Sequence, residues 1–184
     1  MNTKLILAVP CLALLAACGG SSTGVASFST LGNQGIALLN THQNAQSTPV
    51  QNMPSGTFSY SGVAAYSPIN SSDGATIINN AIAVSSIDLD ANFSTNSLTG
   101  SLSNFVGADN YTATGSVPLS GTISGTGFTA SGSAVVVSSF DNSNLLTTAD
   151  INGQFFGNQA EVASGFMSAS IGNVSGSGVF VAER

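Results

Sequence analysis

The chain has 184 residues, of which 5% are charged, and its formal net charge is −6. Its only basic residues are Lys4 and Arg184. Nucleic-acid binding requires several Lys or Arg side chains that displace phosphate counterions, so this composition excludes nucleic-acid partners. Solubility must come from Ser, Thr, Asn and Gly, a composition that suits the outer face of a β-sheet better than a helix.

The first eighteen residues have the layout of a secretory signal. A basic residue, Lys4, precedes an apolar run over residues 5–15, and the small residues Ala16 and Ala17 stand directly before Cys18. The apolar run is too short to span a membrane. Leu15-Ala16-Ala17-Cys18 resembles the bacterial lipobox, which implies a signal peptide over residues 1–17 and acylation of Cys18. The alternative is an ordinary signal peptide that is cleaved near Ala17.

Cysteine usage favours the lipid. Cys11 is removed with the signal, so the exported chain keeps one Cys and cannot form an intramolecular disulfide. Acyl chains such as palmitate add about 0.8 kcal/mol of membrane affinity for each buried methylene group. We therefore expect a membrane anchor through the N-terminal lipid. An Asp directly after the lipidated cysteine would resemble an inner-membrane retention signal. This chain has Gly19 there, which favours the outer membrane or the cell surface.

Residues 18–53 are rich in Ser, Gly, Asn, Gln and Thr, and their apolar residues show no sustained helical or strand periodicity. Such a segment buries too little apolar surface to offset its ordering entropy, which predicts a flexible tether. Residues Ile36–Leu39 could still dock as a helical turn or an extra strand. His42 falls in this segment without a second ligand or catalytic partner nearby, and we expect an exposed linker residue.

Residues 54–184 alternate apolar and polar side chains in short runs, which indicates β-strands. The eight predicted strands are Gly56–Tyr66, Ala83–Phe93, Ser97–Phe105, Gly115–Ser124, Gly127–Val137, Thr148–Phe156, Ala160–Ile171 and Gly176–Ala182. Gaps of two or three residues at 94–96, 125–126 and 157–159 require antiparallel hairpins. The longer gaps, residues 67–82 and 138–147, predict loops of the kind that carry binding, although residues 75–81 could form a helical turn.

Eight antiparallel strands can close as a barrel or stack as a sandwich. The many glycines inside the strands favour the tight bending of a small barrel, and closure removes the edges that a chain with almost no Lys leaves unprotected. The predicted fold is therefore all-β: an eight-stranded antiparallel up-and-down β-barrel over residues 54–184, preceded by the signal and the tether.

The end of the chain carries a resemblance to a known family. Residues 151–161 read INGQFFGNQAE, Ser164-Gly165-Phe166 follow, and the chain closes with Gly178-Val179-Phe180-Val181-Ala182. This pattern resembles the C-terminal eight-stranded barrel of transferrin-binding protein B and the small barrel lipoproteins related to it. The matching motif residues, to which the resemblance assigns a structural role, are Gly153, Phe155, Phe156, Gly157, Ala160, Glu161, Gly165, Gly178 and Phe180. Asn158 and Ser164 depart from the family's Pro and Gly but keep turn and small-residue character.

The resemblance implies surface-lipoprotein architecture and no more. Host-protein recognition in that family lies largely in a separate N-terminal lobe and in variable loops, and this chain has the sequence of one barrel, so transferrin binding is not carried over. Glu161 is expected to accept hydrogen bonds from amides of the turn between the sixth and seventh strands.

The sequence offers no catalytic, metal or cofactor site. The single His lies in the tether, and no nucleophile motif, phosphate loop or Cys/His metal spacing is present. Asp88 and Asp90 share one strand face and could hold a cation, but alternation with Ile87 and Leu89 favours two solvated carboxylates. The aromatic residues could line a ligand cavity, although a packed core fits the mixed large and small inward residues better.

We therefore expect a lipid-anchored, non-enzymatic binding module, monomeric, with an unknown protein or small ligand held by its loops. One alternative is a structural or adhesive envelope lipoprotein. Another is an accessory of iron or haem uptake. This alternative rests on family analogy, and the sequence offers no His, Tyr pair or Cys that could be placed as an axial ligand of haem iron.

Overall fold

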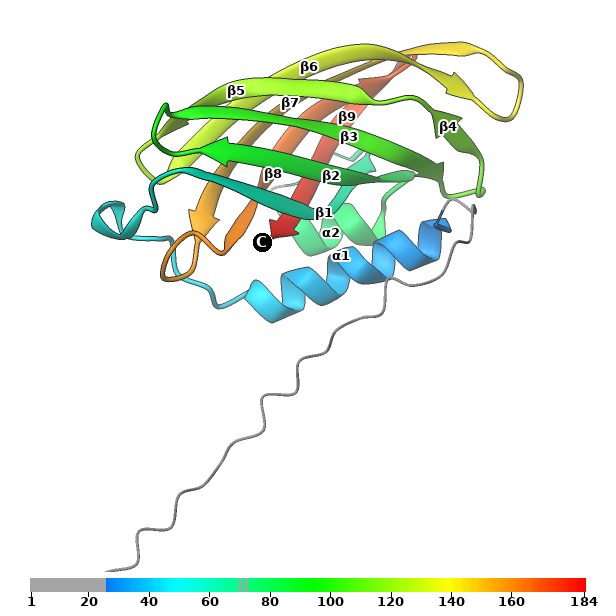
Figure 1. Cartoon of the computed structure of the whole chain (residues 1–184). Helices are drawn as coiled ribbons and strands as arrows, with labels where there is room; N and C mark the ends of the chain where they lie inside the picture. Colours follow the sequence, from blue (N-terminus) through cyan, green and yellow to red (C-terminus); the bar gives the residue numbers. More distant parts are fainter. Residues whose placement is uncertain (1–25, 70, 72) are drawn as a thin grey trace, which may run out of the picture.

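The computed structural model describes residues 26–69, 71 and 73–184, which form one antiparallel sheet with two helices on its outer surface (Figure 1). Its nine strands are β1 (Thr57–Ser67), β2 (Ala83–Asn92), β3 (Ser97–Gly107), β4 (Thr112–Thr114), β5 (Val117–Ser124), β6 (Gly127–Ser138), β7 (Asn144–Phe156), β8 (Val162–Ile171) and β9 (Val174–Glu183). The helices are α1 (Phe28–His42), α2 (Gly74–Asn79) and the short 3-10 helix η1 (Val50–Asn52).

The sheet closes on itself. β9 pairs antiparallel with both β8 and β1, and β2 pairs with both β1 and β3. The ring continues through β5, β6 and β7, so eight strands of the described chain form a closed antiparallel barrel. The short β4 lies between β3 and β6 at one end. The predicted all-β barrel is thus confirmed, with β4 as an addition that the sequence pattern did not indicate.

The barrel interior follows the predicted alternation. On β2 the side chains of Ile87 and Leu89 are buried, whereas those of Asp88 and Asp90 are exposed. Aromatic rings fill one part of the interior: the Phe155 ring lies 4.8 to 5.6 Å, between centroids, from three others, those of Tyr60, Phe93 and Phe128. These rings form a packed core.

The predicted flexible tether is wrong for residues 28–42, which form α1. Ser27 caps the helix by accepting a hydrogen bond from the amide of Thr30. Leu31 is then buried against a second apolar cluster on the outside of the barrel, where Val63, Ala65, Val84, Val106 and Val179 also lie. Periodicity within the segment is weak, and the helix is stabilised by apolar side chains on the outer face of distant strands.

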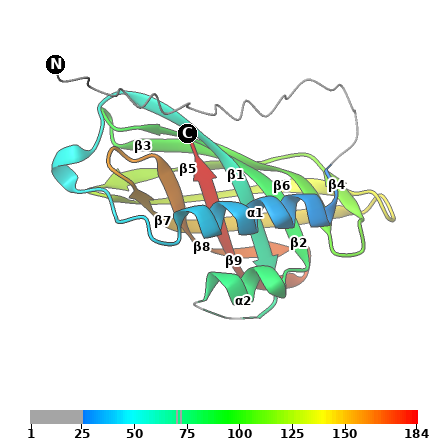
Figure 2. The ribbon, with the colours of Figure 1, turned by 90° about the horizontal axis from the view of Figure 1, so that it is seen from below.

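Each end of the barrel has its own set of connections (Figure 2). We call "terminal end" the end formed by the β2–β3, β5–β6 and β7–β8 turns, where β1 begins and β9 finishes. We call "loop end" the opposite end, formed by the β1–β2, β3–β4, β6–β7 and β8–β9 connections. The β1–β2 connection contains α2, whose N-cap Asp73 accepts hydrogen bonds from the amides of Ala75 and Thr76. This is the helical turn that the sequence left open over residues 75–81.

Candidate functional site

The β7–β8 turn at the terminal end carries the centre of the family-like motif. Gly157 has φ +94° and Ala160 has φ +64°, so both lie in the left-handed region. The Glu161 carboxylate accepts a hydrogen bond from the Gln159 amide at 2.9 Å, and this bond lowers the pKa of Glu161. A Cβ at position 157 would collide with that carboxylate. The negative charge of Glu161 therefore holds the turn and is not directed into a substrate cavity.

Two side chains connect this turn to the rest of the terminal end. The Tyr60 hydroxyl donates to the Ala160 carbonyl at 2.6 Å, and burial raises the pKa of Tyr60 to about 12. The Arg184 guanidinium donates to the Gln159 carbonyl at 2.7 Å and lies 4.2 Å from the centroid of the Phe58 ring. The β7–β8 turn is thus hydrogen-bonded to side chains from β1 and from the end of the chain.

The segment that follows α1 covers the same end. Thr48 donates its hydroxyl to the Gly157 carbonyl at 2.9 Å and its amide to the Phe155 carbonyl at 2.9 Å. His42, predicted to be an exposed linker residue, instead contacts Glu183 with 2.9 Å between Nε2 and Oε2. These contacts hold the segment after α1 against the terminal end.

Two motif glycines let aromatic rings lie against the inner wall. Cross-strand pairs place Phe128 beside Gly153 and Phe180 beside Gly165, and Gly153 itself pairs with Gly165. A Cβ on Gly153 would collide with the rings of Phe128 and Phe180, whose centroids are 5.9 Å apart. The rings therefore cover the inner face of this glycine pair, in the way that aromatic side chains stabilise glycines in sheets.

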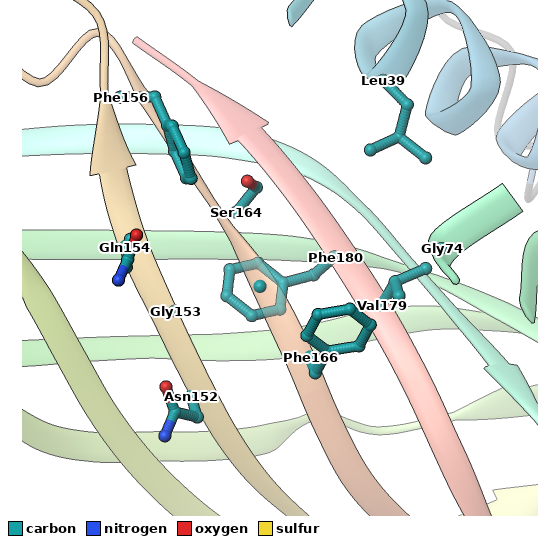
Figure 3. A pocket seen from close by; sticks show the side chains of 11 residues that line it. Leu39, Gly74, Asn152, Gly153, Gln154, Phe156, Ser164, Phe166, Val179 and Phe180 are labelled. Atoms are coloured by element: carbon teal, nitrogen blue, oxygen red, sulfur yellow. The ribbon is translucent and has the colours of Figure 1, made fainter. Parts of the chain in front are cut away.

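A groove lies on the outer side of the same glycine pair (Figure 3). It has a volume of about 410 Å³ and lies between the outer faces of β7, β8 and β9, the C-terminal half of α1 and the start of α2. Leu39 reaches over it from α1, Phe156 and Phe166 lie on either side of Ser164, and Asn152 and Gln154 lie along the β7 side. The groove combines an apolar floor with a few amide and hydroxyl groups, as small-molecule sites do.

The loop end presents a cluster of exposed apolar side chains. The rings of Tyr111 in the β3–β4 loop and Phe140 in the β6–β7 loop contact each other, with centroids 4.6 Å apart and planes tilted by 57°, although these residues are 50% and 67% exposed. Val135 and Leu146, which pair across β6 and β7, are 54% and 57% exposed. We call these four residues the loop-end patch. An exposed apolar cluster of this kind is typical of an interaction surface.

Acidic side chains border the loop-end patch. Asp109 precedes Tyr111 by two residues in one loop, and Asp141 follows Phe140 in the other. Hydrogen bonds from Ser143 lower the pKa of Asp141, so this carboxylate stays charged at neutral pH. Arg184, the one Lys or Arg side chain of the described residues, lies at the terminal end. The patch is therefore aromatic, apolar and anionic.

The remaining predicted site residues do not form a chemical centre. The Asp88 and Asp90 carboxylates accept hydrogen bonds from Ser61 and Ser59, at 2.8 and 2.5 Å, on the outer wall. Among residues 26–69, 71 and 73–184, no three His, Cys, Asp or Glu side chains gather as metal ligands. No helix in that part of the chain is long and apolar enough to cross a membrane. Cys18 lies outside the described residues.

Sequence reasoning missed the loop-end patch. The sequence pattern predicts that the aromatic residues lie inside the barrel, whereas Phe140 and Tyr111 are exposed. Both follow turn-forming or polar residues within loops, Asp109-Asn110 before Tyr111 and Ser138-Ser139 before Phe140. A large aromatic side chain in such a loop was the available signal, because loops rarely provide a core position for it.

Comparison with known proteins gives one family. A family model described as the C-lobe and N-lobe β-barrels of transferrin-binding protein B matches residues 53–184. A solved point mutant of transferrin-binding protein B from Haemophilus parasuis is 22% identical, with a TM-score of 0.49, over 75% of this chain and 28% of that chain. Intact Ap-TbpB, with its N and C lobes, is 21% identical, with a TM-score of 0.47 and the same two coverages. No curated protein matches this chain.

This chain spans less than a third of the length of those two solved proteins. The family model, in contrast, covers well over half of the chain and includes every strand of the barrel. The chain therefore belongs to the family of the C-lobe and N-lobe β-barrels of transferrin-binding protein B.

Proposed function

We propose that this chain is a lipid-anchored, non-enzymatic module of the bacterial outer membrane or cell surface that binds a protein partner through its loop-end patch. The observation that carries the proposal is the contact between the Tyr111 and Phe140 rings, which two separate loops hold in a tilted and largely exposed arrangement. Exposed aromatic residues are frequent hot spots of protein interfaces. Membership of a family named for a binding protein supports a binding role rather than catalysis.

The charges beside the patch define the partner. Asp109 and Asp141 lie next to the two aromatic residues, so the complementary surface presents Lys or Arg beside apolar side chains. Loss of Lys4 with the signal changes the net charge from −6 to −7. This charge attracts such a surface over longer distances, and salt weakens that attraction. We therefore expect an association rate that falls as ionic strength rises.

A pull-down from envelope extracts of the source cells tests the binding role. The full chain carrying Tyr111→Ser and Phe140→Ser should lose a protein that the wild-type chain retains. Val50→Ser is the matched control, because Val50 is an exposed apolar residue, 65% exposed, in η1 beside the terminal end. Transferrin is tested separately as a purified protein. Equal capture by both variants would contradict binding through the patch, and the structural or adhesive alternative would then be favoured.

The anchor is tested separately. Cys18→Ser should move the protein from the membrane fraction to the soluble periplasmic or secreted fraction, because the acyl chains are then lost. Fractionation followed by immunoblotting measures the distribution. If the Ser variant stays with membranes, Cys18 is not the anchor.

A further inference from the structure

A row of outward side chains crosses five neighbouring strands of the barrel wall. Cross-strand pairs join Thr122 on β5 to Thr129 on β6, Thr129 to Asn152 on β7, Asn152 to Phe166 on β8, and Phe166 to Val179 on β9. Neighbouring strands lie about 4.8 Å apart, so the row spans about 19 Å. This row runs across the strands and not along them.

A second row lies directly beside the first. It contains Ser131, Asp150 and Ser168, which are paired across β6, β7 and β8. Three hollows follow the two rows, with volumes of about 410, 270 and 540 Å³. Asn152 lines all three of them, so these shallow hollows adjoin one another at Asn152, and together we call them the wall trough.

The polar groups of the wall trough are available to a ligand. Within the described part of the chain, the side chains of Asn152, Gln154 and Ser168 have no hydrogen-bond partner in the protein, and all three residues are exposed. In most of the outer wall such groups meet only water. Here they line a depression whose α1 side is apolar, with Phe166 46% exposed beside them.

The charge of the wall trough restricts its ligand. Among the described residues that line the three hollows there is no Lys, Arg or His side chain, and Asp150 is the one carboxylate. Anionic ligands such as phosphates, sulfated sugars or fatty acids would therefore gain no counter-charge. A purely apolar ligand would leave the amide and hydroxyl groups of both rows without hydrogen bonds, which disfavours it. A neutral ligand with many hydroxyl groups and an apolar ring face meets both conditions.

We propose that the wall trough binds a neutral oligosaccharide that lies across β5 to β9. The Phe166 ring contacts the C–H face of one sugar ring, and the Asn152 and Gln154 amides bond to sugar hydroxyls. The length of the rows accommodates several linked sugar rings. The loop-end patch reaches the same wall only at Val135 and Leu146, which lie four residues along β6 and β7 from Ser131 and Asp150, so the two sites share no residue.

A glycan array tests the proposal. The full chain carrying Cys18→Ser is applied to an array of neutral, sialylated and sulfated glycans, and the best neutral glycan is then titrated by calorimetry. Binding should be selective for neutral glycans, and Phe166→Ala and Asn152→Ala should each weaken it about tenfold, the equivalent of one good contact. Phe140→Ala is the control, because it removes an exposed Phe of the loop-end patch and should leave glycan affinity unchanged.

Several outcomes would overturn the proposal. These are binding to none of the glycans, binding to sialylated or sulfated glycans alone, or equal weakening by Phe166→Ala and Phe140→Ala. Thermal melting of each variant shows that the barrel is intact, and Phe166 and Asn152 are both exposed, so their truncation should not unfold it. If the Phe166→Ala or Asn152→Ala variant loses glycan binding but still captures a protein partner, the glycan site is separate from the proposed function.

Discussion

The terminal end and the loop end of this barrel use similar residue types for opposite purposes. At the terminal end, Tyr60 and Arg184 donate hydrogen bonds to the β7–β8 turn, and Phe58 lies under the guanidinium. At the loop end, Tyr111 and Phe140 contact each other and are otherwise open to water. Aromatic residues thus stabilise the fold where their polar and apolar parts both have partners, and they are available for recognition where they do not.

Removal of most of β9, the last strand of the barrel, should have the largest effect on stability. β9 pairs with β8 and β1, so deletion of residues 176–184 opens two sheet edges and removes Phe180 and Arg184. We expect the loss of cooperative unfolding, or aggregation, in thermal melts followed by circular dichroism. A monomeric truncation with an unchanged melting curve would show that barrel closure contributes little to stability.

A matched pair of phenylalanine truncations gives the next largest effect. Phe180 is 1% exposed and Phe140 is 67% exposed. Phe180→Ala should cost about 3 to 5 kcal/mol of unfolding free energy, whereas exposed Phe140→Ala should stay within about 0.5 kcal/mol of wild type. Denaturant titration of both variants measures the difference. Similar costs at both positions would remove the distinction between a structural and a recognition end.

Removal of one hydroxyl group should have a smaller effect that depends on pH. Tyr60→Phe leaves the Ala160 carbonyl without its donor and should cost about 1 to 3 kcal/mol at neutral pH, whereas exposed Tyr111→Phe should cost almost nothing. The pKa of Tyr60 is raised from 10.0 to about 12, so the folded state favours the protonated phenol. Its stabilisation is complete below pH 10 and is lost as pH rises through about 12.

Denaturant titrations between pH 9 and 12 check this sign. The difference in unfolding free energy between wild type and Tyr60→Phe should shrink as pH rises, while Tyr66, which is present in both proteins, contributes equally to each. A difference that stays constant over this range would mean that Tyr60 titrates normally.

Sequence reasoning recovered the barrel because its signals are local. Alternation and short turns predicted the strand faces, including the exposed Asp88 and Asp90. It failed for α1, whose stability comes from outward Val63 and Val179 on strands far along the chain. In β1, residues 62–67 are buried without interruption, and such a run indicates cover on both faces of a strand. The loop-end patch and the wall trough depend on cross-strand register and loop proximity, which composition does not contain.

The direction of α1 limits how far the loop end can lie from an N-terminal anchor. The helix begins near the loop end, where Phe28 packs against the apolar cluster on the outside of the barrel. It ends at the terminal end, where His42 contacts Glu183 (Figure 2). The chain between Cys18 and Ser27 can extend at most about 30 Å. With Cys18 acylated as proposed, the start of α1 would lie within about 30 Å of the lipid. A partner of the loop-end patch would then have to reach its site in the space close to that membrane.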